Sequence, residues 1–263
     1  MDTEDSKEHC RAYLLAKGFT VEDIPTVPGE KRADLRAHYG QEEYILEAKE
    51  REETHRWRSL LAKVTENGQA TMSRVVEPWN AVSSMIEGAC RQLEATPSSQ
   101  SAFHILWIVA LRGDEEFVIR CVEKRLFGLE TVTAVKSPHD PVRVFPCYYY
   151  SHADFPRFPI LDAAVLCLRD KGFLCVNSFS LKREALRQGH LYSLLARQRA
   201  VRDPELLERR GKAFLIEKQI DRGPHGAQWQ FLRDKYGCGT SKMINSQFDS
   251  LLSVPRDLVD GNS

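Results

Sequence analysis

The sequence has no excess of charge of either sign. Its 263 residues contain 37 Lys and Arg against 37 Asp and Glu, so the formal net charge is zero. Domains that bind nucleic acid through their overall charge are usually basic, so any basic surface here must be local. The N-terminus lacks a basic segment followed by an apolar run, and the longest apolar run, Ile105 to Leu111, is too short to span a bilayer. We therefore expect a soluble cytoplasmic protein without a signal peptide or membrane contact.

The sequence also lacks paired cysteines. Its seven cysteines are odd in number and widely spaced, and no C-x-x-C pair occurs. Most lie within apolar runs, as Cys167 does in Val165 to Leu168. This pattern indicates buried free thiols in a reducing compartment rather than disulfides or a zinc site. The cysteines are Cys10, Cys90, Cys121, Cys147, Cys167, Cys175 and Cys238.

Several nucleotide and hydrolase motifs are absent. The sequence contains no Walker A motif, no G-x-G-x-x-G and no G-x-S-x-G. These absences count against a nucleotide-driven motor, a dehydrogenase and a serine hydrolase, and they predict no nucleotide cofactor.

Apolar periodicity predicts an α/β fold. Helices alternate with strands in the first 180 residues, and a helical portion follows. We therefore expect a mixed β-sheet flanked by helices in residues 1–180 and a helical region in residues 181–263. The expected helices are 4–17, 80–96, 115–127, 182–201 and 204–220. The expected strands are 19–24, 32–39, 43–49, 103–111, 129–135, 143–150, 163–168 and 173–178.

The segment with the clearest chemistry is a predicted hairpin of residues 32–39 and 43–49. Side chains alternate along a strand, so Glu47 and Lys49 should point to the same face. Asp34 lies on the neighbouring strand and could meet Glu47 across the hairpin. The pattern predicts two carboxylates and one ammonium at a single place.

Such a cluster has the groups that phosphodiester hydrolysis needs. Mg²⁺ binds through one or two carboxylates and leaves other positions for water and phosphate oxygens. The ion would activate water and neutralise phosphate charge. Lys49 would orient or deprotonate the attacking water, or stabilise the transition state.

A simpler interpretation is that Glu47 and Lys49 form an ordinary charged strand face. An acid-x-Lys triplet is common, and a second copy occurs at Asp5-Ser6-Lys7, within a predicted helix. Under this alternative the protein is an unrelated α/β protein and its carboxylates are surface charges.

The wider pattern resembles the PD-(D/E)XK nuclease superfamily, whose restriction-endonuclease-like core runs helix, three strands, helix, strand. Asp34 matches the first acid of the motif and Glu47-Ala48-Lys49 matches its E-x-K, although Ala33 replaces the usual proline. The segment from Glu8 to Gly18-Phe19 is similar to the opening of Holliday-junction-resolvase-like and Mrr-like members. The resemblance implies that Asp34, Glu47 and the Ala48 carbonyl bind the metal, and that Glu8 binds metal-coordinated water.

One further feature of exonuclease-like members is only half present. These members carry Gln-x-x-x-Tyr on the helix after the E-x-K strand. Here Gln92 lies on that helix, but Thr96 stands four residues later. Gln92 could approach the site, but the simpler interpretation is an ordinary polar residue near a helix end, which argues against a processive exonuclease.

A basic stretch lies in residues 182–212, with nine basic residues against four acidic ones. Lys182, Arg183 and Arg187 are candidates for binding nucleic-acid phosphates. The alternative is the solvated face of two amphipathic helices.

Two other groups of residues are weaker candidates. His139-Asp140 and His152-Ala153-Asp154 lack a third metal ligand at a recognisable spacing, so surface loops are the better interpretation. Tyr148-Tyr149-Tyr150 could stack bases, but packing in the core is more common for strand aromatics.

The sequence therefore predicts a Mg²⁺-dependent DNA endonuclease, with Mn²⁺ able to substitute, acting in restriction, repair or defence. Glu8, Asp34, Glu47 and Lys49 are the expected catalytic residues. Because cutting both strands of a duplex usually needs two sites, a homodimer is expected. The alternative is a nuclease-fold protein that binds nucleic acid, or serves in an assembly, without cleaving.

Overall fold

The computed structural model describes most of the chain. Its described residues are 4–51, 59, 72–75, 80–110, 115–135, 143–149, 153–168, 171–217, 226–237, 240–243 and 248–251. The helices are α1 (Glu4–Ala16), α3 (Asn80–Ala95), α4 (Glu115–Phe127), the 3-10 helix η1 (Phe155–Arg157), α5 (Arg183–Gln188), α6 (His190–Arg197), α7 (Pro204–Arg209) and α8 (Gly226–Tyr236).

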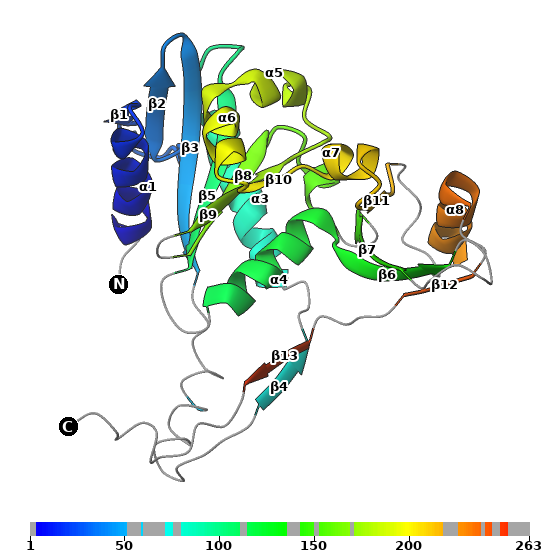
Figure 1. Ribbon diagram of the computed structural model, residues 1–263. Helices are drawn as coiled ribbons and strands as arrows, with labels where there is room; N and C mark the ends of the chain where they lie inside the picture. Colours follow the sequence, from blue (N-terminus) through cyan, green and yellow to red (C-terminus); the bar gives the residue numbers. More distant parts are fainter. Residues whose placement is uncertain are drawn as a thin grey trace.

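The main sheet has seven strands in the order β1-β2-β3-β5-β8-β9-β10 (Figure 1). Strands β3, β5 and β8 are parallel to one another, whereas the β1–β2, β2–β3 and β8–β9 pairs are antiparallel. The sheet is therefore mixed, and the α/β class expected from the sequence is confirmed. Its strands are β1 (Thr20–Asp23), β2 (Leu35–Tyr39), β3 (Glu42–Arg51), β5 (Phe103–Ala110), β8 (Ala163–Cys167), β9 (Gly172–Val176) and β10 (Val201–Arg202).

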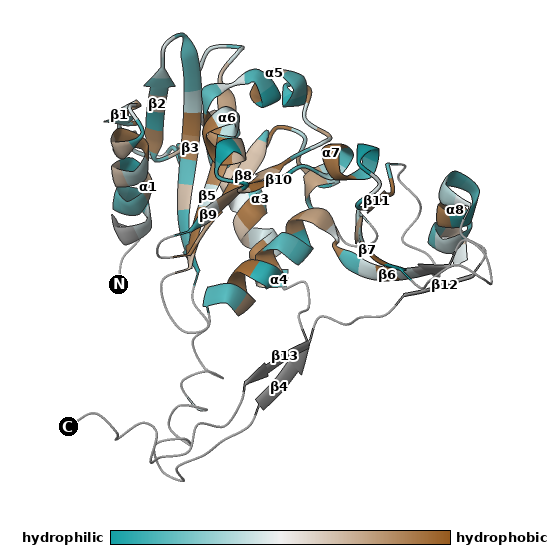
Figure 2. Ribbon diagram, viewed as in Figure 1, coloured by the Kyte–Doolittle hydropathy of each residue, from teal (hydrophilic) through white to brown (hydrophobic). Residues whose placement is uncertain are grey.

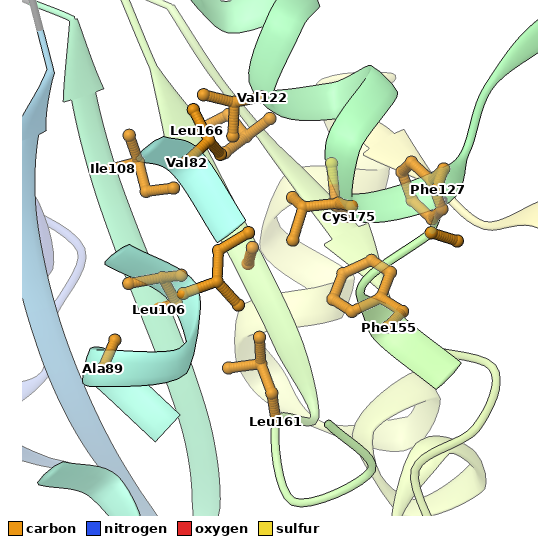
Figure 3. Packing of buried hydrophobic residues seen from close by; sticks show 14 of the residues in the cluster. Val82, Ala89, Leu106, Ile108, Val122, Phe127, Phe155, Leu161, Leu166 and Cys175 are labelled. Carbon is orange, nitrogen blue, oxygen red and sulfur yellow. The ribbon is translucent and has the colours of Figure 1, made fainter. Parts of the chain in front are cut away.

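Apolar clusters cover both faces of this sheet. On one face, Cys10 and Leu14 of α1 and side chains of α5 and α6 pack against Leu46 and Ala48. On the other face, side chains of α3 and α4 form a cluster with Ile45, Leu106 and further residues. Figure 3 shows Leu106 and Ile108 of β5 in this cluster, with Val82 and Ala89 of α3. Strand β5 is buried along its whole length. Hydrophobic residues, coloured brown, are frequent within the main sheet, whereas β3 also carries hydrophilic stretches (Figure 2). The parallel centre is thus buried on both sides, as is usual for such strands.

Two smaller groups of strands complete the fold. A four-stranded sheet has the order β11-β7-β6-β12, and β4 pairs with β13. These strands are β4 (Met72–Val75), β6 (Glu130–Val135), β7 (Arg143–Tyr148), β11 (Phe214–Leu215), β12 (Thr240–Met243) and β13 (Phe248–Leu251).

Residues 4–51 agree closely with the sequence prediction, except that β2 begins at Leu35 instead of residue 32; the strand β4 is not predicted by the sequence. Helix α1 ends before Gly18, whose φ of +84° is a left-handed conformation that glycine adopts without strain. The amide of Phe19 donates to the Leu14 carbonyl at 3.1 Å, as expected for a helix C-cap. Gly40, with φ +58°, lies between β2 and β3, so the predicted hairpin is present.

The two long C-terminal helices predicted from the sequence are wrong in part. The expected helix 182–201 is split at Gly189, because the Glu42 carboxylate accepts the His190 amide at 2.9 Å and starts α6 there. It ends at Arg197, and the chain then enters β10 in the main sheet.

The expected helix 204–220 stops at Arg209, and residues 214–215 pair with β7 instead. Residues 218–220 lie outside the described ranges. A division between residues 180 and 181 stays a prediction, and the contacts described here join residues on both sides of it.

The cysteine prediction is confirmed for the six cysteines within the described ranges, all of which are buried and free. Cys238 lies outside these ranges. In the described part of the chain, no helix is long and apolar enough to cross a membrane.

Candidate functional site

Strand β3 directs Glu47 and Lys49 toward α3. Ile45 belongs to the cluster on the α3 face, whereas Leu46 and Ala48 belong to the cluster on the α1 face. By alternation, Glu47 and Lys49 share the face of Ile45. The predicted orientation is therefore present.

Asp34 lies beside them, where β2 leaves β3. The regular pairing ends at Leu35 opposite Leu46, and beyond it the Asp34 amide donates to the Leu46 carbonyl at 3.1 Å. The Asp34 carboxylate then accepts the Ala48 amide at 2.8 Å. The Asp34 side chain thus accepts a hydrogen bond from the backbone of β3. This bond holds the Asp34 carboxylate next to Glu47.

Glu47 is an ionisable group in an apolar place. Its neighbour in register on β5 is Leu106, and its exposed fraction is 0%. Lys49 donates to its Oε1, while Oε2 is buried and no donor among the described residues reaches it. Burial, together with the neighbouring Asp34 carboxylate, raises the pKa of Glu47 to about 8, although Lys49 lowers it. Such a carboxylate would be stabilised by a cation at Oε2.

Gln92 joins this cluster, contrary to its interpretation as an ordinary helix-end residue. Its Oε1 lies 3.4 Å from Lys49 Nζ, and its Nε2 donates to the Arg32 carbonyl at 3.1 Å. Sequence reasoning discounted Gln92 because the expected tyrosine is Thr96. Its position on the helix after the E-x-K strand was the signal that should have been kept.

Glu8 is not brought to this cluster. It lies on α1, which packs on the opposite face of the sheet, and its side chain is 58% exposed. The Arg11 guanidinium donates to its carboxylate at 3.2 Å. Asp34, Glu47, Lys49 and Gln92 therefore converge without it.

Lys182, Arg183 and Arg187 have partners within the chain. Lys182 donates to the Ala102 carbonyl, and Arg183 lies 3.5 Å from Glu205. Arg187 makes two hydrogen bonds of 2.8 Å to Asp203 and is only 10% exposed. These contacts would have to be exchanged for contacts to phosphate if the three residues bound nucleic acid, and their role in such binding stays a prediction.

The Arg187–Asp203 pair leads to a stability prediction. Asp203 is 2% exposed, so Arg187→Ala would leave a buried carboxylate without its main partner. We expect a loss of about 3–5 kcal/mol in the free energy of unfolding, measured by denaturant titration. Arg197→Ala is the control, because Arg197 is exposed and makes a single 3.3 Å contact with a carbonyl. Equal stability of Arg187→Ala and wild type would contradict the prediction.

The tyrosines and the His-Asp groups are the weaker candidates from the sequence, and only some of them lie within the described ranges. Tyr148 and Tyr149 are buried, as expected for packing, and Tyr150, His139, Asp140 and His152 lie outside the described ranges. Asp154, which follows His152 in the sequence, is fully buried. It is held by Arg125 and Arg157, each at 2.8 Å, and by Ser83.

The Asp34 and Glu47 carboxylates are hard oxygen donors of the kind that Mg²⁺ binds. Within the described ranges, no group of three or more His, Cys, Asp or Glu side chains is arranged to hold a metal ion. The arrangement offers two adjacent carboxylates, a cation beside one of them and an amide that contacts this cation. Comparison with protein-family models, curated proteins and solved structures finds no match to this chain.

Proposed function

We propose that this protein is a Mg²⁺-dependent DNA endonuclease and that Asp34, Glu47 and Lys49 form its active site. The observation that carries the proposal is the buried Glu47 carboxylate. It lies beside Asp34, pairs with Lys49 through one oxygen and leaves the other without a donor. An ordinary charged strand face would be solvated, and it would not bury one carboxyl group beside a second one.

The order of elements supports a restriction-endonuclease-like core. Within the main sheet and its flanking helices, α1 is followed by β1, the β2–β3 hairpin, α3 and then β5, which pairs parallel to β3; β4, between β3 and α3, pairs with β13 outside this sheet. This is the order helix, three strands, helix, strand that the resemblance to PD-(D/E)XK nucleases implies. In this proposal the acids stand where β2 and β3 separate, at the end of the regular pairing.

Asp34, Glu47 and the Ala48 carbonyl would hold the metal ion. When bound, Mg²⁺ supplies activation of water and neutralisation of charge on the phosphate. Lys49 places its ammonium beside the acids, where it would stabilise negative charge that develops on the phosphate during cleavage. Gln92 contacts Lys49 and the Arg32 carbonyl, and so would fix the position of this ammonium.

The substrate is proposed to be duplex DNA, and a homodimer would bring two sites to its two strands. A restriction, repair or defence role suits such an enzyme. Lys182, Arg183 and Arg187 stay candidates for phosphate contacts, although each would have to exchange a partner within the chain.

Nicking of supercoiled plasmid tests the proposal. The purified protein should nick with Mg²⁺ or Mn²⁺, and excess EDTA should stop the reaction. Asp34→Asn should lose nicking, because its amide is a much weaker metal ligand than a carboxylate. Glu8→Gln should retain nicking, since Glu8 lies on the other face of the sheet.

Absence of nicking by the wild-type protein under all these conditions would contradict the endonuclease. Binding of a divalent ion and of DNA without nicking would favour the alternative, a protein of this fold that acts as a binding or assembly module.

A further inference from the structure

Residues 32–34 lead into the proposed active site but are not held by a regular strand ladder. The β2–β3 pairing begins at Leu35, one residue after Asp34. Ala33 is nevertheless buried, so its backbone amide needs a partner from elsewhere. The Asp34 amide bonds to the Leu46 carbonyl, and two side chains near the end of α3 hold the backbone of Arg32 and Ala33.

Thr96 is the first of these side chains. It follows the last residue of α3 and is only 4% exposed. Its hydroxyl accepts the Ala33 amide at 2.8 Å and donates to the Gln92 carbonyl at 2.7 Å. The hydroxyl therefore acts as donor and acceptor at once, with its proton directed to the helix and its lone pair to the segment.

Gln92 is the second. Its Nε2 donates to the Arg32 carbonyl at 3.1 Å, one residue before the Thr96 contact. Together these side chains hold two consecutive residues immediately before Asp34. On the other side, the Asp34 carbonyl accepts the Ile24 amide at 3.1 Å. The backbone on both sides of the Asp34 side chain is thus fixed.

We propose that Thr96 is a positioning residue that sets the Asp34 carboxylate on the Ala48 amide, next to Glu47. The predicted effect on metal binding rests on the proposed function. The placement of the Asp34 carboxylate, however, can be measured in the metal-free protein. Thr96 touches Ala33 and not the acids, so it acts through the backbone. A side chain of the same shape without a hydroxyl would leave the buried Ala33 amide without an acceptor.

Thr96→Val and Thr96→Ser test this role in the full-length protein. The first readout is the exchange rate of the Ala48 amide proton, followed by NMR in protein labelled with ¹⁵N-alanine and free of metal. Thr96→Val should raise the exchange rate of the Ala48 amide about 10-fold, when this rate is normalised to that of the Ala37 amide in the middle of β2. Thr96→Ser retains the hydroxyl and should restore the wild-type rate. The second readout is the Mn²⁺ dissociation constant, which Thr96→Val should raise about 10-fold, the usual effect of removing a supporting contact.

Ser83→Ala is the matched control, because Ser83 is a buried hydroxyl near the other end of α3 and bonds to Asp154. It should lower the melting temperature and change neither readout. An unchanged Ala48 rate in Thr96→Val, or equal acceleration of all alanine amides, would overturn the inference. If the wild type binds no Mn²⁺, the proposed function fails. The exchange rate of the Ala48 amide in Thr96→Val still tests whether Thr96 positions Asp34.

Discussion

Glu47→Gln should abolish DNA cleavage and make the metal-free protein more stable at pH 8. Glutamine has nearly the same shape as glutamate but carries no charge, and it is a poor ligand for Mg²⁺. In the wild type, burial and the Asp34 carboxylate raise the pKa of Glu47 to about 8. Ionised Glu47 is therefore a source of instability that the substitution removes.

The pH dependence has a definite sign. In the unfolded chain a glutamate has a pKa of about 4.3. Between that value and pH 8, Glu47 therefore holds its proton in the folded state and has lost it in the unfolded state. Wild-type stability should fall as the pH rises through this window, and that of Glu47→Gln should not show this fall. At pH 8.5 we expect an advantage on the order of 1–3 kcal/mol, or several degrees in melting temperature, which should largely vanish at pH 5. Thermal melts in EDTA at both pH values measure it.

Glu43→Gln is the matched control on the same strand. Partial burial raises the pKa of Glu43, but hydrogen bonds from Ser99 and the charge of Arg36 outweigh this effect and hold it below its usual value. The same substitution should therefore reduce stability at pH 8.5. A lower melting temperature for Glu47→Gln than for wild type at pH 8.5 would contradict the prediction. It would mean that groups within the protein stabilise the ionised Glu47 carboxylate.

Lys49→Met should lower the rate of DNA cleavage about 10²–10³-fold and leave the divalent ion bound. Removing one preformed group that stabilises transition-state charge typically has an effect of this size. The methionine chain preserves the apolar part of the lysine beside Ile108, its neighbour in register on β5. The ammonium of Lys49 also repels a cation held by the acids, so its loss should leave Mn²⁺ affinity unchanged or tighter.

Single-turnover cleavage of a labelled duplex separates this effect from DNA binding. Lys49→Arg keeps the charge but has a different shape, and it should recover part of the rate. Cleavage by Lys49→Met at the wild-type rate would remove Lys49 from the active site. Loss of Mn²⁺ binding in this variant would instead indicate that the substitution disturbs Glu47 or Asp34.

The local part of the candidate site could be predicted from the sequence. Strand alternation places Glu47 and Lys49 on one face, and a two-residue turn at Gly40 and Gln41 is enough to bring Asp34 opposite. These are short-range consequences of backbone geometry. Contacts between distant segments were not accessible in the same way, and Gln92 reaches Lys49 only because α3 packs on β3.

The errors have the same origin. The basic stretch of the sequence does not indicate that Asp203 and Glu205, more than 15 residues later in the chain, bind Arg187. The break at Gly189 depends on Glu42, 148 residues before His190. Helical periodicity carries no information about either partner. The burial of Glu47, which carries the proposed function, likewise depends on the packing of α3 and β5 around it.

A calorimetric titration of the metal-free protein with Mn²⁺ tests the central claim most directly. The account predicts saturable binding by the wild type, binding by Glu43→Gln of similar affinity, and no binding by Asp34→Ala or Glu47→Ala. Absence of binding by the wild type, or undiminished binding by both alanine variants, would contradict it.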